Sequence, residues 1–102
     1  MSQQKSKHQV SIDYCRACGY EVIIRPLIQR IEEELPEVQV TTRISVRDSL
    51  EIKYNGFPIF SKLELGGFPD PEKVIETLKG CVSGIPPTRM TTSVHPFYCA
   101  LL

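Results

Sequence analysis

Two cysteines near the start of the chain could carry out thiol chemistry. Cys15 and Cys18 form a Cys-x-x-Cys pair, with Arg16 and Ala17 between them. Two intervening residues allow a tight turn, so one sulfur can attack a substrate disulfide while the other resolves the mixed disulfide. A helix after the pair would stabilise a thiolate through its N-terminal amides and dipole, and the charge of Arg16 acts in the same direction. The pair therefore predicts a redox site with Cys15 and Cys18 as its catalytic residues.

Two other interpretations of the cysteine pair remain open. A structural zinc site commonly takes four ligands from two such pairs, whereas the other candidate ligands are scattered along the chain: His8, Cys81, His95 and Cys99. The pair could also be buried and chemically inert. Cys81 lies on or just after a predicted helix, where most cysteines behave as small buried apolar side chains, and it is assigned no role. We therefore expect no metal and rank redox competence first.

The last four residues could carry a different chemistry, the covalent attachment of a lipid. They are Cys-Ala-Leu-Leu, beginning at Cys99, and match the C-a-a-X motif; leucine in the final position favours a geranylgeranyl group. This motif predicts a protein prenyltransferase and a membrane as partners. Stable anchoring generally takes two signals, and no basic cluster lies beside Cys99. Attachment is therefore expected to be reversible or shared with a partner.

The composition predicts one soluble domain. The chain has 102 residues, 41% of them hydrophobic and 24% charged, and its 12 basic and 12 acidic residues cancel. This balance provides no basic surface for nucleic acid, and the apolar runs are too short to span a bilayer. The first residues are polar and lack the apolar core of a secretory signal. We therefore expect a cytoplasmic chain in a reducing compartment, where cysteines favour catalysis or modification over structural disulfides.

Alternation of apolar and polar residues predicts three strands, and a hairpin turn predicts a fourth. The alternating positions are Val10, Ile12 and Tyr14; Val38, Val40 and Thr42; and Leu50, Ile52 and Tyr54, while the run 57–61 returns as the fourth strand. Asn55 and Gly56 predict a tight hairpin turn before the fourth strand, because both residues accept a positive φ. Pro58 places the fourth strand at a sheet edge, since proline cannot donate a hydrogen bond to a neighbouring strand.

Two helices are also predicted. Apolar residues recur with helical spacing between Tyr20 and Leu35, but Pro26 interrupts this stretch. Either this helix begins near Arg25 with Pro26 in its first turn, or it begins at the cysteines and bends at the proline. The second helix begins at Asp70, a residue suited to cap it, and a proline follows at the first helical position.

The order of these elements is β-α-β-β-β-α. The first strand, helix and second strand form a crossover unit, which makes the two strands parallel neighbours. A strand that ends in Cys-x-x-Cys and continues into a helix is the thioredoxin-type arrangement. We therefore predict an α/β, thioredoxin-like domain over residues 9–81, with a four-stranded mixed sheet and both helices on one face. Residues 1–8 are expected to be disordered, and residues 82–102 to form a flexible tail that ends in the prenylation box.

Several stretches of the chain resemble the selenoprotein W family, also called Rdx. They are residues 14–21 around the cysteine pair, residues 50–52 with the Asn-Gly turn, and the run Phe-Ser-Lys-Leu-Glu followed by Gly-Gly-Phe-Pro in 60–69. The resemblance implies a thioredoxin-like fold and a redox-active pair linked to glutathione as a co-substrate, with no further cofactor. With the box at Cys99, it is closest to a prenylated member associated with cell migration, filopodium formation, Akt-kinase signalling and resistance to apoptosis. It also implies attachment to the cytoplasmic face of the plasma membrane.

The chain departs from that pattern in three places. The paired tyrosines of an activation motif are replaced at residues 24–27 and 35–38, so a kinase-substrate role is not expected. The glycine-rich loop before the third strand is replaced by residues 45–49, and if this loop approaches the cysteines it could alter substrate access. No proline precedes the third strand, where thioredoxins place a cis-proline opposite their cysteines.

Two arguments disagree on which cysteine attacks. Exposure in thioredoxin-like sites favours Cys15, whereas the selenocysteine of selenoprotein W falls at the position of Cys18; Cys15 is ranked slightly ahead. The leading functional hypothesis is a membrane-tethered, redox-responsive signalling adaptor whose signalling partner the sequence does not name. The alternative is a glutathione-coupled thiol-disulfide oxidoreductase, and a third is a small interaction domain with inert thiols.

Overall fold

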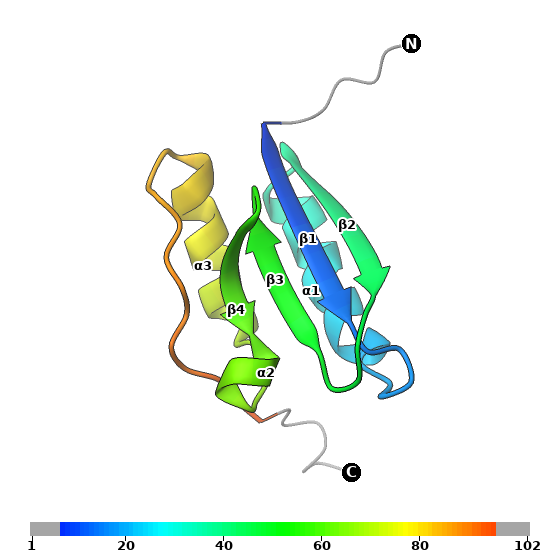
Figure 1. Cartoon of the computed structure of the whole chain (residues 1–102). Helices are drawn as coiled ribbons and strands as arrows, with labels where there is room; N and C mark the ends of the chain where they lie inside the picture. Colours follow the sequence, from blue (N-terminus) through cyan, green and yellow to red (C-terminus); the bar gives the residue numbers. More distant parts are fainter. Residues whose placement is uncertain (1–6, 96–102) are drawn as a thin grey trace.

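The computed structural model describes residues 7–95, which form a four-stranded sheet backed by helices (Figure 1). The strands are β1 (His8–Tyr14), β2 (Val38–Ile44), β3 (Leu50–Tyr54) and β4 (Phe57–Ser61). The helices are α1 (Glu21–Glu34), α2 (Lys62–Leu65) and α3 (Pro71–Val82). This order confirms the predicted elements and adds α2, a short helix that the periodicity did not indicate.

The sheet is mixed, with the strand order β2-β1-β3-β4. β1 and β2 run parallel, with Val10 opposite Val40, as the crossover through α1 requires. The pairs β1–β3 and β3–β4 are antiparallel. Asn55 (φ 48°) and Gly56 (φ 86°) form the turn between β3 and β4, which confirms the predicted hairpin. The four-stranded mixed sheet is thus confirmed, and β4 lies at its edge as Pro58 indicated.

Helices α1 and α3 both cover one face of the sheet, behind the strands in Figure 1, as predicted. The core between these layers includes fully buried side chains from strands and helices: Ile12, Ile24, Ile31, Ile52, Val74 and Leu78. Ion pairs between partly exposed side chains join the two helices: Arg30 with Glu72 (2.6 Å) and Lys79 with Glu34 (3.3 Å). Such pairs add little stability, so burial of the core holds the helices in place.

Strand β4 carries a β-bulge that turns two neighbouring side chains toward the interior. Ile52 pairs with Phe60 and Lys53 pairs with Pro58, which leaves Ile59 as the extra residue. Ile59 and Phe60 are both buried, with 0% and 2% of their surface exposed, although a regular strand would place them on opposite faces.

Helix α1 begins at Glu21 and contains Pro26 in its interior. The alternative in which the helix begins near Arg25 is therefore wrong, and the helix begins shortly after Cys18. Proline cannot donate the hydrogen bond that the helix needs at this position. The buried side chains of α1, among them Leu27 directly after the proline, stabilise the helix in spite of this loss.

The start of the domain is held by the turn between β3 and β4. The Asn55 side chain accepts a hydrogen bond from Gln9 N–H at 2.8 Å and donates one to the Lys7 carbonyl at 3.0 Å. His8, which the sequence placed in the disordered lead-in, is already part of β1. Residues 1–6 of that lead-in lie outside the described residues.

The segment after α3 runs back along β4 and ends near α2 (Figure 1). Met90 N–H donates to the Ile59 carbonyl at 2.7 Å, and Phe68 and Val94 exchange two backbone hydrogen bonds of 2.8 Å. These contacts occur where the sequence predicts a flexible tail. A single bridge between distant residues leaves no periodic pattern, so the sequence could not show it. None of the helices within residues 7–95 is long and apolar enough to cross a membrane.

Candidate redox site

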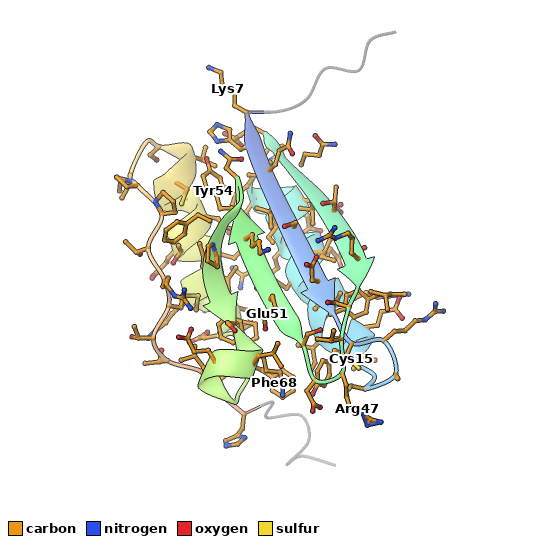
Figure 2. The ribbon with its side chains drawn as sticks, viewed as in Figure 1. Lys7, Cys15, Arg47, Glu51, Tyr54 and Phe68 are labelled. Carbon is orange, nitrogen blue, oxygen red and sulfur yellow. The ribbon has the colours of Figure 1, made fainter. Side chains whose placement is uncertain are left out.

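Strand pairing brings Cys15 beside the loop that precedes β3. Tyr14, the last residue of β1, pairs with Leu50, the first residue of β3. Directly beyond this pair, Cys15 N–H donates to the Ser49 carbonyl at 2.9 Å. Figure 2 shows Cys15 at this end of the sheet. The loop 45–49 therefore approaches the cysteine pair. A loop in this position was expected to alter the access of a substrate to the cysteines.

The turn between the two cysteines directs a backbone amide at the first of them. Residues 16–20 form turns between β1 and α1, and Gly19 N–H donates to the Arg16 carbonyl at 3.0 Å. Gly19 has a φ of 78°, a left-handed conformation that glycine adopts without steric cost. Within this turn, Cys18 N–H donates to the Cys15 sulfur at 3.2 Å. A hydrogen bond donated to sulfur favours the thiolate form.

Asp48 is a site residue that the sequence analysis did not identify. Its N–H donates to the Cys18 sulfur at 3.4 Å, and its Oδ1 accepts from the same thiol at 3.7 Å. Its φ is 67°, which is uncommon outside glycine but tolerated by aspartate. Buried Ser49 fixes the loop, because its hydroxyl donates to the Val46 carbonyl at 2.7 Å. The pairing of the first and third strands could have located this loop, but not the residue that faces the sulfur.

Asp48 contacts Cys18 from the loop before β3, a loop that contains no proline. Proline has no N–H and could not donate to a sulfur. In this chain the residue beside Cys18 has both an N–H and a carboxylate, and both engage the thiol. The loop before β3 therefore bonds with the cysteine pair directly.

The two thiols hold their protons unequally. The hydrogen bond with the Cys18 side chain lowers the pKa of Cys15, and the backbone amides of Asp48 and Cys18 act in the same direction against the effect of burial. The same side-chain hydrogen bond raises the pKa of Cys18. The pair titrates as a unit, and the two directions favour Cys15 over Cys18 as the sulfur that carries the negative charge.

Exposure does not explain this preference, and the argument that Cys15 is the more exposed cysteine is wrong. Cys15 has only 3% of its surface exposed, whereas Cys18 is half-buried. The two cysteines differ in exposure because of their positions. Cys15 is bonded to Ser49, the residue before β3, whereas Cys18 belongs to the turn between β1 and α1. What favours Cys15 as the nucleophile is the set of donors around its sulfur.

The family model for Rdx proteins matches residues 9–80, most of the chain. The chain belongs to the Rdx family. Curated relatives include migration and invasion enhancer 1 from Mus musculus, which is 33% identical over 93 residues, covering 91% of this chain and 79% of the relative. The protein of the same name from Bos taurus is 33% identical over 94 residues, covering 92% of this chain and 80% of the relative.

Solved structures share the fold of this Rdx-family chain. A selenoprotein W-related protein from Vibrio cholerae aligns with a TM-score of 0.70 and 26% identity, over 74% of this chain and 98% of the other. A crystal structure from Bordetella parapertussis aligns with a TM-score of 0.62 and 23% identity, over 74% and 94% of the two chains. The predicted thioredoxin-like fold is thereby confirmed.

Cys81 lies away from the site, at the other end of the sheet of this Rdx-family chain. Its carbonyl accepts a hydrogen bond from the Tyr54 hydroxyl at 3.5 Å, and Tyr54 pairs with Val10 at the far end of β3 from Leu50. Figure 2 shows Tyr54 and Cys15 at opposite ends of the sheet. The Cys81 thiol is buried, and burial raises its pKa. The fold therefore does not bring Cys81 to the redox pair.

The remaining candidate residues are not brought to the cysteine pair. His8 lies at the Tyr54 end of the sheet, with its Nδ1 2.6 Å from the Tyr54 hydroxyl. Within residues 7–95, no three His, Cys, Asp or Glu side chains are grouped so that they could hold a metal ion. Cys99, the predicted lipidation residue, lies outside the described residues.

Proposed function

We propose that this Rdx-family chain is a membrane-tethered, redox-responsive signalling adaptor of the migration and invasion enhancer 1 type. In this role it promotes cell migration and filopodium formation through Akt-type kinase signalling. The observation that carries the proposal is the 33% identity to migration and invasion enhancer 1 over 91% of this chain, together with the C-a-a-X box at Cys99. The residues that replace the paired tyrosines exclude a kinase-substrate motif at 24–27 and 35–38 from this proposal.

The proposed tether is an isoprenoid on Cys99 that holds the domain at the cytoplasmic face of the plasma membrane. Each lipid CH₂ buried in a bilayer contributes about 0.8 kcal/mol, and one chain alone gives reversible binding. The formal net charge of zero supplies no strong electrostatic attraction to anionic lipids. The adaptor therefore exchanges between membrane and cytoplasm, and a membrane-bound partner prolongs its stay.

Replacing the lipidated residue tests the adaptor directly. Cys99→Ser in animal cells is expected to shift the protein to the soluble fraction and to abolish its effect on migration. Leu102→Ser is the matched control, because serine in the last position keeps the C-a-a-X box and favours a farnesyl group instead. A Cys99→Ser protein that keeps both its membrane location and its signalling output would refute the proposal.

A second candidate function, glutathione-coupled thiol-disulfide exchange, is favoured by the hydrogen bond from Cys18 N–H to the Cys15 sulfur. The Cys15 thiolate attacks one sulfur of a substrate disulfide, which breaks that S–S bond and releases the other sulfur as a thiolate that takes up a proton. Cys18 then loses its proton, Asp48 Oδ1 being the nearby acceptor, and attacks the Cys15 sulfur. The second substrate thiol leaves and a Cys15–Cys18 disulfide remains. Two glutathione molecules reduce this disulfide and become glutathione disulfide.

The exchange reaction predicts different fates for the two cysteines. With a glutathionylated peptide as substrate, Cys18→Ser is expected to accumulate a mixed disulfide on Cys15, detectable by intact mass. Cys15→Ser is expected to lose turnover without trapping this species, and Cys81→Ala serves as the control because Cys81 lies outside the site. If neither Cys15→Ser nor Cys18→Ser changed turnover or signalling, the thiols would be inert and the chain a small interaction domain.

A further inference from the structure

An apolar groove lies between α1 and the segment that links α2 to α3. Its volume is about 750 Å³. Its apolar wall comes from the first half of α1 and from the Gly-Gly-Phe-Pro loop: Val22, Ile23, Pro26, Leu27, Phe68 and Pro69. Val22 has 67% of its surface exposed. Such a surface indicates an apolar occupant.

The charged side chains in the groove wall do not call for a charged ligand. Arg30 pairs with Glu72 at 2.6 Å, and both line the groove. Glu33 accepts a hydrogen bond from Gln29 at 3.3 Å, and Asp70 caps the start of α3 by accepting from Glu72 N–H at 3.0 Å. Because these groups already have partners within the chain, the apolar part of the wall determines what the groove binds.

The C-terminal segment leaves the domain at the wall of this groove. Val94 is fixed against Phe68 by two backbone hydrogen bonds of 2.8 Å, and Val94 and His95 both line the groove. Four residue steps separate His95 from Cys99. An extended chain covers at most about 14 Å in that distance, so any group on Cys99 is confined to the neighbourhood of the groove.

We propose that the groove shelters the isoprenoid attached to Cys99 of the same chain. This inference rests on the lipidation proposed above. A lipid that leaves the membrane would expose its methylene groups to water, which is unfavourable, and the groove provides an apolar surface within reach. The groove and the bilayer then compete for one lipid, and the groove-bound form is the soluble form of the protein. The groove binds the lipid of its own chain rather than that of a second molecule, because attachment at Cys99 keeps the effective concentration of this lipid at the groove high.

The test uses full-length protein that has been geranylgeranylated in vitro by the type I transferase and checked by intact mass. Partition into phosphatidylcholine vesicles is measured for the wild type and for Val22→Asp, which places a charge in the groove wall. Val46→Asp is the matched control, since Val46 is similarly exposed, at 63%, and lies in the loop before β3, outside the groove. We expect Val22→Asp to bind vesicles about tenfold more tightly than the wild type. This factor corresponds to a wild type in which the sheltered form outnumbers the free form by about ten to one. Val46→Asp is expected to bind as the wild type does.

A second measurement is independent of this variant. Prenylation of the wild type is expected to change the amide chemical shifts of α1 and of Phe68, Asp70 and Glu72, without vesicles present. Equal partition of all three proteins with unchanged shifts would overturn the inference while leaving the anchor intact. Vesicle binding that falls as protein concentration rises, with dimers in solution, would overturn the intramolecular form in favour of a second copy. A chain that the transferase does not modify at Cys99 would overturn the proposed tether and the inference together.

Discussion

Cys15 and Cys81 lie at opposite ends of the sheet and are almost equally buried, with 3% and 5% of their surface exposed. Their pKa values nevertheless move in opposite directions. Burial raises the pKa of Cys81. The same effect of burial is present at Cys15, but the hydrogen bond with Cys18 outweighs it and the pKa falls. In this fold the donors around a buried sulfur, and not its burial, decide whether it can act as a thiolate.

The difference follows from the elements that carry the two residues. Cys81 is in α3, where the nearby amides already bond within the helix. Cys15 follows the last residue of β1 and precedes a turn, so the Cys18 amide is available to its sulfur. The end of β1 followed by a turn therefore places an amide donor at the Cys15 sulfur, whereas Cys81 lies in the last turn of α3.

Alkylation of the native protein should separate the two cysteines most strongly. A neutral alkylating reagent is expected to modify half-buried Cys18, and Cys15 at the start of the turn, through local opening of that turn in the folded protein. Cys81 is part of the hydrophobic core and should be reached only after the core opens. Because global unfolding costs about 5–15 kcal/mol, the Cys81 rate should be lower by a factor of at least about 10³. Peptide mass spectrometry after a short pulse, with a denatured sample as control, measures the difference. Equal alkylation rates for Cys81 and the Cys15–Cys18 pair in the folded protein would contradict the proposed difference between the two ends of the sheet.

Removing each buried sulfur sharpens the comparison further. Cys15→Ala and Cys81→Ala both leave a small cavity, and each is expected to lower the free energy of unfolding by about 1 kcal/mol. When each change is made in the Cys18→Ser protein, where the mixed disulfide is not resolved, only Cys15→Ala should abolish mixed-disulfide formation with glutathione disulfide. Urea unfolding monitored by circular dichroism gives the first quantity and intact mass gives the second. Loss of the mixed disulfide in Cys81→Ala would show that the two ends of the sheet are not independent.

The role of the Cys18 side chain as a hydrogen-bond donor can be tested by substitutions that leave the Cys18 backbone amide in place. Cys18→Ala removes the side chain that lowers the pKa of Cys15, so the pH at which Cys15 becomes reactive should rise. Cys18→Ser keeps a hydroxyl donor and should preserve more of the shift. Both variants retain the Cys18 backbone amide, which limits the size of the change. The measurement is the pH dependence of Cys15 alkylation, and identical midpoints for the two variants would contradict a donor role.

The smallest effect is expected at Asp48. Its negative charge raises the pKa of both cysteines, although its backbone amide acts in the opposite direction. Asp48→Asn keeps the amide, tolerates the positive φ and removes the charge. The pKa of each thiol should therefore fall, and alkylation of the pair should begin at a lower pH than in the wild type. A shift to higher pH would mean that the loop has moved away from Cys18.

The sequence predicted those parts of the fold that depend on neighbouring residues. Alternation located the first three strands, and the Asn55-Gly56 turn located the hairpin and with it the fourth strand, because each of these signals acts over a few residues. The interior position of Pro26 could not be deduced, since it depends on the apolar stripe of α1 packing on the sheet. The bridge between Phe68 and Val94 was missed for a similar reason, because it joins residues that only the finished fold brings together.

The sequence predicted which two cysteines form the candidate site, but not how they and the residues around them are arranged. The spacing of Cys15 and Cys18 identified the pair, and the loop 45–49 was recognised as a departure from the family pattern. The sequence could not show that Asp48 turns both its N–H and its carboxylate toward Cys18. It also could not show that Cys15 is the more buried thiol, because that depends on its bond to Ser49.

The two outer edges of the sheet differ in their resistance to pairing with another molecule. At β4, Pro58, the bulge and the bond from Met90 interrupt the regular row of backbone groups that a foreign strand would need. β2 is a longer strand of 7 residues at the opposite edge, and its Arg43 is an exposed charge bonded to Asp13 at 3.0 Å. Charge therefore protects one edge of the sheet against pairing with another strand, and backbone shape protects the other.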